Sequence, residues 1–324
     1  MKILPGIIFV LILSVLGCKD GKNNYAEKEP LSINKSETGK PTVSFTFDDG
    51  STQDIAGFPF KEWNQMILTH LEEEDLKAIF FVTGQNKLDE NGQFLLESWT
   101  KNGHKIANHT FTHPNFNAEK NNANVFEQEL KATDTIISKF KNSIKLFRFP
   151  YLKEGQNKTK VDSLRNILAA YGYHNGYVTI DTSDWYINQR LINKIRKLGF
   201  ENTAIEKFRD FYLQHILERA NYYEKLSFEI NKNHIHHVIL LHHNLTSALF
   251  LGNLIERFKE EGWDVTDADK AYKDDIFKDI PRTEFAGESL IYSLAKQSGN
   301  YNNSLRYPAE DSRYEKDKMD KLGL

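Results

Sequence analysis

From residue 41 onward, short apolar runs alternate with segments of helical periodicity, and this alternation limits the folds that the chain can adopt. The apolar runs include TVSFTF, KAIFFVTG and HHVILLHH, and helical spacing marks EWNQMILTHLEEED, NVFEQELKATDTIISKFK and SALFLGNLIERFKEEG. Strands that are apolar on both faces are typical of a parallel sheet covered by helices. So many strand–helix repeats in one unit predict an α/β fold, a closed or nearly closed β/α barrel over residues 41–275.

Two segments depart from this rhythm. Residues 190–233 carry no strand signal, and apolar side chains recur there at helical spacing, at Ile205, Phe208, Tyr212, Ile216 and Tyr223. This pattern predicts a helical insertion that packs on the barrel, with a lid or a partner surface as alternatives. Residues 276–324 are expected to form a C-terminal helix and a charged tail, and the weakly patterned sequence from Tyr301 predicts a peripheral or mobile end.

The N-terminus has the layout of a signal peptide. Lys2 precedes an apolar run over residues 3–16, and this run is shorter than the roughly 20 residues of a transmembrane helix. The following VLGC resembles a bacterial lipoprotein cleavage box, which predicts a signal over residues 1–17 and a lipid anchor at Cys18. Residues 18–40 would then be a flexible tether with a reach of about 25 Å. The alternative is a plain secretory signal with an incidental cysteine.

This layout predicts an extracytoplasmic protein, anchored to a bacterial cell membrane on the periplasmic or surface side. The formal net charge is −3, with 45 acidic and 42 basic residues, so nothing in the composition favours nucleic acid or an anionic membrane surface as a partner. Cys18 is the single cysteine of the sequence, which excludes an internal disulfide and a thiolate metal cluster.

Chemically active residue types stand at the ends of the predicted strands, where barrels of this kind build their active sites. The first strand ends on Asp48 and Asp49. Two adjacent carboxylates repel one another, and burying either costs several kcal/mol unless a cation or hydrogen bonds compensate. The alternative is a solvated turn, since Asp-Gly is a common turn pair.

His109 and His113 in NHTFTHP are four residues apart. On a helical turn this spacing would place both imidazoles on one face, within reach of one metal ion. Alone the pattern is weak. With a carboxylate such as Asp49 it becomes a set of two histidines and one acid, which leaves coordination positions open for water and substrate.

Three later strand ends supply further candidates. Arg148 in RFPY needs an anion if it points into the barrel mouth, and Asp48 would serve; the alternative is a surface salt bridge. The acids of DTSDW, which begins at Asp181, could instead cap a helix. In VILLHHN the strand period puts His242 and His243 on opposite faces, so only one of them can face the site. We interpret the nearby His234, His236 and His237 as polar residues at the strand entry.

Taken together, TFDDG, HTFTH, RFPY, DTSDW and LLHH resemble, in order, the five motifs of the polysaccharide deacetylase family, the NodB-homology domain of carbohydrate esterase family 4. The resemblance covers roughly residues 41–270 and implies a distorted (β/α) barrel. His243 stands where the family usually has an acid or a small residue. The insertion at 190–233 is also longer than the usual connection, and both departures bear on substrate choice.

The resemblance implies a role for each matched position. A divalent metal, with zinc favoured, would be held by Asp49, His109 and His113. Asp48 would be the general base and Arg148 would hold it in place. His242 would be the general acid, oriented and charged by Asp181. The substrate would meet Pro150, the backbone at Tyr151 and the side chain of Trp185.

The implied reaction is removal of N-acetyl groups from amino sugars of a polysaccharide or oligosaccharide, such as peptidoglycan or a chitin-like glycan, with release of acetate. Three alternatives stay open from the sequence. They are an O-deacetylase such as an acetylxylan esterase, a catalytically inactive glycan-binding lipoprotein, and a non-haem iron oxygenase, which also uses two histidines and a carboxylate. The alternation of strands and helices argues against the oxygenase, whose scaffold is usually all-β.

Overall fold

The computed structural model describes residues 39–306 and 311–324. The signal peptide, Cys18 and nearly all of the tether lie outside these residues, so the lipid anchor stays a prediction. Among the helices of the described residues, none is both long enough and apolar enough to cross a membrane.

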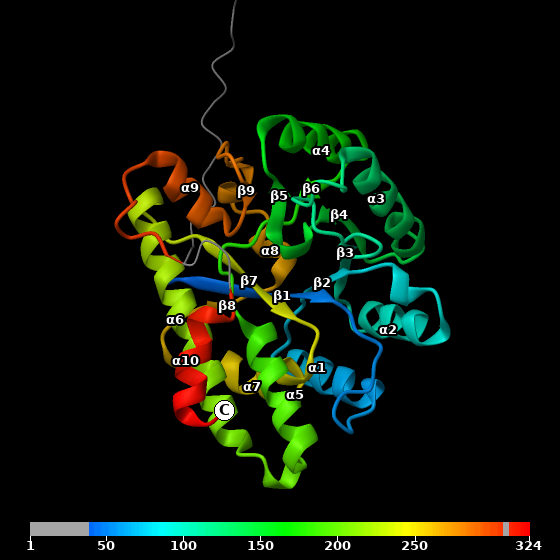
Figure 1. The fold of residues 1–324 in the computed structure, drawn as a ribbon, viewed down its shortest axis with the longest axis vertical. Helices are drawn as coiled ribbons and strands as arrows, with labels where there is room; N and C mark the ends of the chain where they lie inside the picture. The colour runs from blue at the N-terminus through cyan, green and yellow to red at the C-terminus, as the bar shows by residue number, and fades with distance from the viewer. Residues whose placement is uncertain (1–38, 307–310) are drawn as a thin grey trace, which may run out of the picture. The chain divides into compact units, whose positions relative to one another are not determined.

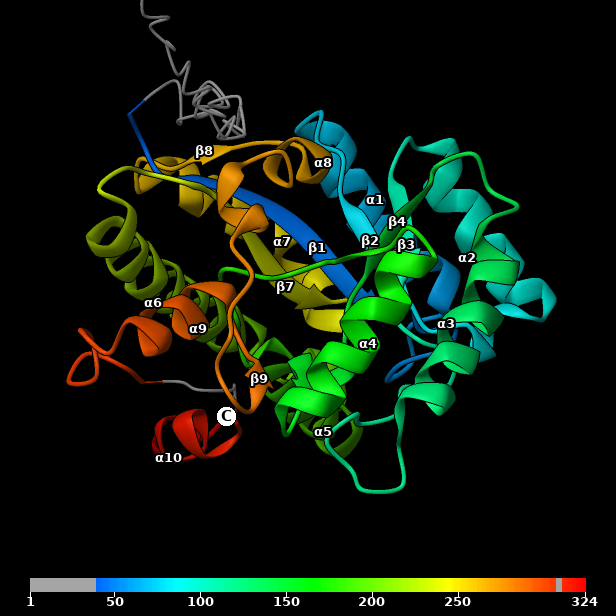
Figure 2. The same ribbon diagram turned by 90° about the horizontal axis from the view of Figure 1, so that it is seen from above.

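In the described part of the chain, seven parallel strands form one sheet that curls into a half-barrel with helices around it (Figures 1 and 2). The order along the sheet is β6-β4-β3-β2-β1-β7, and β8 pairs with the start of β1. The strands are β1 (Thr42–Asp49), β2 (Ile79–Val82), β3 (Lys105–Asn108), β4 (Ser143–Phe147), β6 (His174–Asn175), β7 (His236–His242) and β8 (Asp264–Val265). A separate antiparallel pair joins β5 (Lys153–Gly155) to β9 (Ala286–Gly287).

The described residues form ten α-helices, and most of these helices connect successive strands. They are α1 (Phe60–Glu73), α2 (Glu90–Lys101), α3 (Ala123–Ile137), α4 (Lys158–Ala170), α5 (Asp184–Leu198), α6 (Ile205–Asn231), α7 (Leu245–Glu260), α8 (Ala268–Ala271), α9 (Leu290–Ser298) and α10 (Arg313–Leu322). The short 3-10 helices are η1 (Gln85–Lys87), η2 (Pro150–Leu152), η3 (Phe200–Asn202) and η4 (Asp275–Lys278).

The central strand β1 is buried on both faces, as its apolar sequence predicts. One face packs against the helices, where Phe47 stacks on Phe80 with ring centroids 5.1 Å apart and Phe80 stacks on Trp99 at 4.0 Å. The other face carries Thr46 and, two residues later, Asp48. The strand period therefore directs the Asp48 carboxylate into the half-barrel and away from the aromatic core.

The strand expected over residues 175–181 is short and irregular. β6 pairs with β4, and Ile180 then forms an isolated parallel bridge with Ile239 of β7, so this segment touches both edges of the curled sheet. Between these two points Arg148 Nε donates a hydrogen bond to the Gly176 carbonyl (3.0 Å). The Arg148 side chain thus satisfies a backbone carbonyl that a neighbouring strand would otherwise satisfy.

Helix α6 and the second half of α5 make up the segment 190–233. The predicted stripe is buried at Phe208, Tyr212, Ile216 and Tyr223, in the same core cluster as the β1 and β7 side chains. Helix α10 packs against α6 (Figure 1), and its Glu315 is fully buried. Residues 311–324 are therefore not the loose end that their charged sequence suggests, because Glu315 has an ionic partner on α6.

Candidate metal centre and catalytic site

The chain turns sharply at the end of β1, between Asp48 and Asp49. The φ angles of Asp49 and Gly50 are 75° and 73°, in the left-handed region. The two neighbouring carboxylates consequently face different surroundings, since the side chain of Asp48 is 3% exposed and that of Asp49 is 43% exposed. Glycine suits the second position because a Cβ there would lie 2.8 Å from the Trp99 ring.

A fully buried lysine, Lys87, holds this turn from behind. Its Nζ donates to the carbonyl oxygens of Asp49 (3.2 Å) and Gly50 (2.6 Å), and also to the Thr83 carbonyl (3.3 Å) and Asn86 Oδ1 (2.5 Å). Burial lowers the pKa of Lys87 to about 7. The role of Lys87 is not predictable from the sequence, because nothing near this residue signals contact with a turn so distant along the chain.

Arg148 lies at the end of β4 and neutralises Asp48. Its Nη1 is 2.5 Å from Asp48 Oδ1, and the same nitrogen donates to Thr46 Oγ1 (2.8 Å). Nη2 donates to the Tyr272 hydroxyl (2.9 Å), and the guanidinium carbon lies 3.7 Å from the centroid of the Phe81 ring. The Asp48–Arg148 pair is therefore buried and not the surface salt bridge that was the alternative.

The predicted metal ligands Asp49, His109 and His113 converge. Oδ1 of Asp49 lies 3.8 Å from His109 Nε2 and 3.6 Å from His113 Nε2, and all three ligand atoms lie within 4.8 Å of one another. Atoms at this separation can share one ion, because a Zn–N or Zn–O bond measures about 2 Å. His109 Nδ1 donates to the Arg148 carbonyl (2.8 Å), which leaves the lone pair on Nε2.

The two histidines do not lie on a helical turn, which corrects the local geometry expected from their spacing. They lie in a loop after β3, where Thr110 and His113 have φ angles of 68° and 58°. Glu129 of α3 shapes this loop, because its carboxylate accepts hydrogen bonds from the backbone N–H groups of Phe111 (2.7 Å) and Thr112 (2.6 Å). The spacing of four brings the rings together through this turn and not through helical periodicity.

The electrostatics of His113 suit a metal ligand. Burial and the nearby His109 lower the pKa of His113 to about 4, despite the opposing carboxylates. The imidazole is therefore neutral at pH 7, the form that binds metals. Burial would raise the pKa of Asp49, but His242, His109 and His113 together lower it, so this carboxyl is ionised.

The carboxylate that backs His242 is Asp184 and not Asp181, which corrects the role predicted for Asp181. Oδ1 of Asp184 lies 2.7 Å from His242 Nδ1, and Oδ2 accepts the backbone N–H of His242 (2.8 Å). Asp184 is fully buried at the first residue of α5. The Asp181 carboxylate accepts the N–H of Thr182 (3.0 Å). Both acids lie in DTSDW, and only the helix start at residue 184 distinguishes them.

Asp184 makes His242 a cation. Burial alone would lower the pKa of His242, but the Asp184 carboxylate, with further help from Asp49 and Asp48, raises it to about 10. The side chain of His242 is 24% exposed, so its ring can reach a substrate. A protonated imidazole beside an open face is the arrangement that a general acid requires.

The side chain of His243 points away from the site, on the face of the strand opposite to His242, as the strand period predicts. It is buried between α1 and α2, where its Nε2 pairs with Asn64 Oδ1 (3.0 Å) and its ring packs 4.3 Å from that of Trp63. Burial lowers the pKa of His243 well below its ordinary value. His243 is therefore a neutral core residue, and His242 is the histidine that faces the site.

Two aromatic side chains stand at the rim. Tyr151 is 57% exposed in η2, and its ring centroid lies 4.7 Å from that of His113. Trp185 is 39% exposed in the first turn of α5, next to Asp184. Pro150, the third predicted substrate contact, is buried at the start of η2, where it shapes the backbone of Tyr151.

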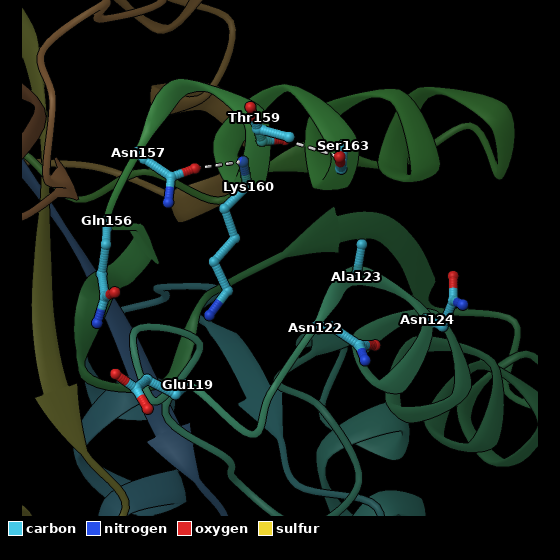
Figure 3. Close-up of a pocket in the computed structure, with 9 residues that line it drawn as sticks. All are labelled: Glu119, Asn122, Ala123, Asn124, Gln156, Asn157, Thr159, Lys160 and Ser163. Carbon is cyan, nitrogen blue, oxygen red and sulfur yellow. Dashed lines mark hydrogen bonds between the residues drawn. The ribbon is translucent and has the colours of Figure 1, made fainter.

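Two cavities lie in this region of the described chain. One of about 400 Å³ opens beside the ligand trio and is lined by Asp49, Ser51, Thr83, Gln85, Asn86, Phe111, Thr112 and His113. A second, of about 580 Å³, lies between the N-termini of α3 and α4 (Figure 3), and amide side chains line it at Asn122, Asn124, Gln156 and Asn157. Asp49 and His113 line the first cavity, whereas none of the metal or acid–base candidates lines the second.

The geometry brings together three residues that could hold a metal ion, a buried aspartate paired with arginine, and a histidine paired with a carboxylate, and this set suits hydrolysis. Residues 35–176 match the family model described as polysaccharide deacetylase. These residues include TFDDG, HTFTH and RFPY, so the matched region, which is less than half of the chain, contains three of the five motifs. Asp184 and His242 lie beyond the matched region.

The chain is similar to deacetylases of known sequence. It is 29% identical over 147 residues to a peptidoglycan-N-acetylglucosamine deacetylase of Bacillus cereus, over 45% of this chain and 47% of the relative. It is 36% identical over 87 residues to a chitooligosaccharide deacetylase of Sinorhizobium fredii, over 27% of this chain and 36% of the relative. The chain thus matches half or less of the length of these relatives.

The fold is similar to that of solved deacetylases. The crystal structure of a peptidoglycan N-acetylglucosamine deacetylase superposes with a TM-score of 0.50 and 22% sequence identity, over 72% of this chain and 89% of that chain. This likeness supports the assignment of the curled (β/α) half-barrel fold.

Proposed function

We propose that this protein is a metal-dependent hydrolase that removes N-acetyl groups from amino sugars of a polysaccharide or oligosaccharide and releases acetate. One observation carries the proposal. The end of β1 and the loop after β3 bring Asp49, His109 and His113 to one point, and a buried acid and a cationic histidine accompany them. Peptidoglycan and chitin-like oligosaccharides are the favoured glycans, because the similar proteins are named for those substrates.

The three ligands fit a divalent metal. The set offers two imidazole nitrogens and one carboxylate oxygen, which suits zinc, and three protein ligands leave coordination positions free. Nδ1 of His109 is engaged by the Arg148 carbonyl, so Nε2 is the nitrogen that would bind the metal, and His113 presents a neutral imidazole, as metal binding requires. When bound, the ion would act as a Lewis acid on the acetyl carbonyl and make the attacking water more acidic.

The chain's own residues supply the proton transfers. Asp48 is the base that accepts the proton of the attacking water, and its pairing with Arg148 compensates the cost of burying its charge. His242 donates a proton to the departing amine, which is a poor leaving group unless protonated. Asp184 holds that proton on His242 and fixes the ring orientation.

The rim of the site suits a glycan. Exposed aromatic rings such as Tyr151 and Trp185 offer flat apolar faces to sugar rings. The ligand trio lies next to Tyr151, so a sugar placed on this ring would have its acetyl group near the metal centre.

The test is acetate release from peptidoglycan, chitooligosaccharides and acetylated xylan, before and after chelation and with zinc restored. We expect release from the N-acetylated glycans, loss on chelation and recovery with zinc. Asp49→Asn should lose both bound metal and activity, while Asp75→Asn, a matched change at a fully exposed side chain, should keep both. Release that is insensitive to chelation and to Asp49→Asn would refute the proposal, and release confined to acetylated xylan would favour an O-deacetylase.

A further inference from the structure

The start of α5 is held by a histidine from a different helix. His215 lies on α6 and is 2% exposed, and its Nε2 accepts the backbone N–H of Ser183 at 2.9 Å. Since this nitrogen is the acceptor, it carries no proton, and the ring proton of a neutral imidazole sits on Nδ1. Ser183 caps α5 and directly precedes Asp184, the carboxylate that backs His242.

Two buried charged residues lie behind His215. Its Nδ1 is 3.4 Å from Oε1 of Glu315 on α10, and the same oxygen accepts a hydrogen bond from Arg219 Nη2 at 2.6 Å. Arg219 and Glu315 are both fully buried. The carboxylate faces the protonated nitrogen of His215, so it favours the tautomer whose Nε2 can accept from Ser183.

These contacts form one connected path from the C-terminal helix to the general acid. Glu315 approaches His215 Nδ1 at 3.4 Å without a hydrogen bond, His215 accepts the backbone N–H of Ser183, and the next residue, Asp184, holds His242 through two hydrogen bonds. A shift of about 1 Å in a supporting group is enough to impair catalysis. Both α6 and α10 lie outside the region that matches the family model.

We propose that His215, which faces Glu315, is a positioning residue for the Asp184–His242 pair. It acts on protonation of the leaving group and leaves metal binding and the base Asp48 unaffected. The inference rests on the proposed deacetylase function, because it assigns His215 to the leaving-group step of that reaction.

Two substrates with different leaving groups can distinguish a positioning role of His215 from a merely structural one. An amine must be protonated to depart, whereas p-nitrophenolate departs without a proton. In the zinc-loaded full chain, His215→Leu should lower kcat for an N-acetylated chitooligosaccharide at least tenfold and lower p-nitrophenyl acetate hydrolysis less than twofold. His215→Gln should recover most of the amide activity, because its Oε1 can accept the Ser183 N–H. Zinc content should be the same in all variants.

The matched control is His104→Leu. His104 is also buried, and its Nδ1 also accepts a backbone N–H, that of Ala78 (3.2 Å), but it lies at the opposite end of the sheet. We expect this variant to lose stability without changing the amide-to-ester activity ratio. If His215→Leu does not fold, Glu315→Gln is the deciding variant, with a selective loss of amide activity expected.

Each outcome decides one question. If His215→Leu or Glu315→Gln loses equal activity on the amide and the ester substrate, or loses activity on neither, the positioning role is overturned. Acetate release by the wild type would still uphold the proposed function in that case. A wild-type chain that releases no acetate from any N-acetylated glycan would instead overturn the function itself.

Discussion

Oδ1 of Asp48 lies 2.5 Å from Nη1 of Arg148, a residue 100 positions further along the chain, and neither side chain is more than 3% exposed. The neighbouring Asp49 faces both His109 and His113, and Asp48 Oδ2 also lies 3.7 Å from His109 Nε2. Two adjacent acids can therefore end a buried strand because each has different surroundings, a buried ion pair for Asp48 and a partly exposed position beside two histidines for Asp49.

Removing the charge of Asp48 should separate catalysis from metal binding. Asp48→Asn keeps the size of the side chain but leaves the buried Arg148 cation without its carboxylate, which should lower the free energy of unfolding by about 3–5 kcal/mol. We expect bound metal to remain and acetate release to disappear. Urea denaturation, metal analysis and the acetate assay measure the three effects, and an active variant would contradict the role of Asp48 as base.

The two histidines at the end of β7 should respond differently to substitution. His242→Ala should abolish amide hydrolysis and should also lower the free energy of unfolding, because it leaves the fully buried Asp184 carboxylate without its cationic partner. His243→Leu should retain most activity and lose about 1–2 kcal/mol, because it removes the hydrogen bond to Asn64 inside the core. Activity normalised to folded protein is the measurement, and the reverse pattern would exchange the two roles.

The carboxylate that charges His242 can be identified by a matched pair of substitutions. Asp184→Asn removes the anion beside His242 Nδ1, so the pKa of His242 should fall and amide hydrolysis should drop by about a hundredfold, the scale of general acid catalysis. Asp181→Asn, measured on folded protein, should cost much less. NMR titration of the His242 ring checks the cause, and an unchanged pKa in Asp184→Asn would exclude the assignment.

The buried lysine should be needed for the metal centre. Lys87→Met keeps the length of the side chain but removes the donor that holds the carbonyls of Asp49 and Gly50. We expect a loss of about 1–3 kcal/mol in stability and weaker zinc binding, measured by denaturation and by competition with a chelator. Lys61→Met, a change at an exposed lysine of α1, is the control. Unchanged zinc affinity in the Lys87 variant would show that the turn holds without it.

Glu315 should make stability depend on acidity. Burial alone would raise its pKa, but His215 and Arg219 lower it from 4.5 to about 2. Because the folded-state pKa is depressed, this stabilisation is present above about pH 4.5 and is lost as the pH falls towards about 2. The shift corresponds to about 3 kcal/mol. Urea denaturation between pH 6 and pH 2 should show a steeper loss in the wild type than in Glu315→Gln, and parallel curves would contradict the assignment.

The fold and most of the site were predictable from local pattern. Strand–helix alternation with doubly apolar strands predicted the parallel sheet, because side-chain period and burial are local properties of a strand. The same period separated His242 from His243. The ordered motifs identified Asp48, Asp49, His109, His113 and Arg148 as the residues that meet, since the carboxyl ends of parallel strands share one edge.

Only the tertiary structure decided how these residues are held. The choice between Asp184 and Asp181 depended on where α5 begins, and the loop of His109 and His113 takes its shape from Glu129 on a later helix. Lys87 and His215 act through backbone groups distant in the sequence. Periodicity records which face a side chain occupies, whereas its partner depends on how separate elements pack, and that information is spread over the whole chain.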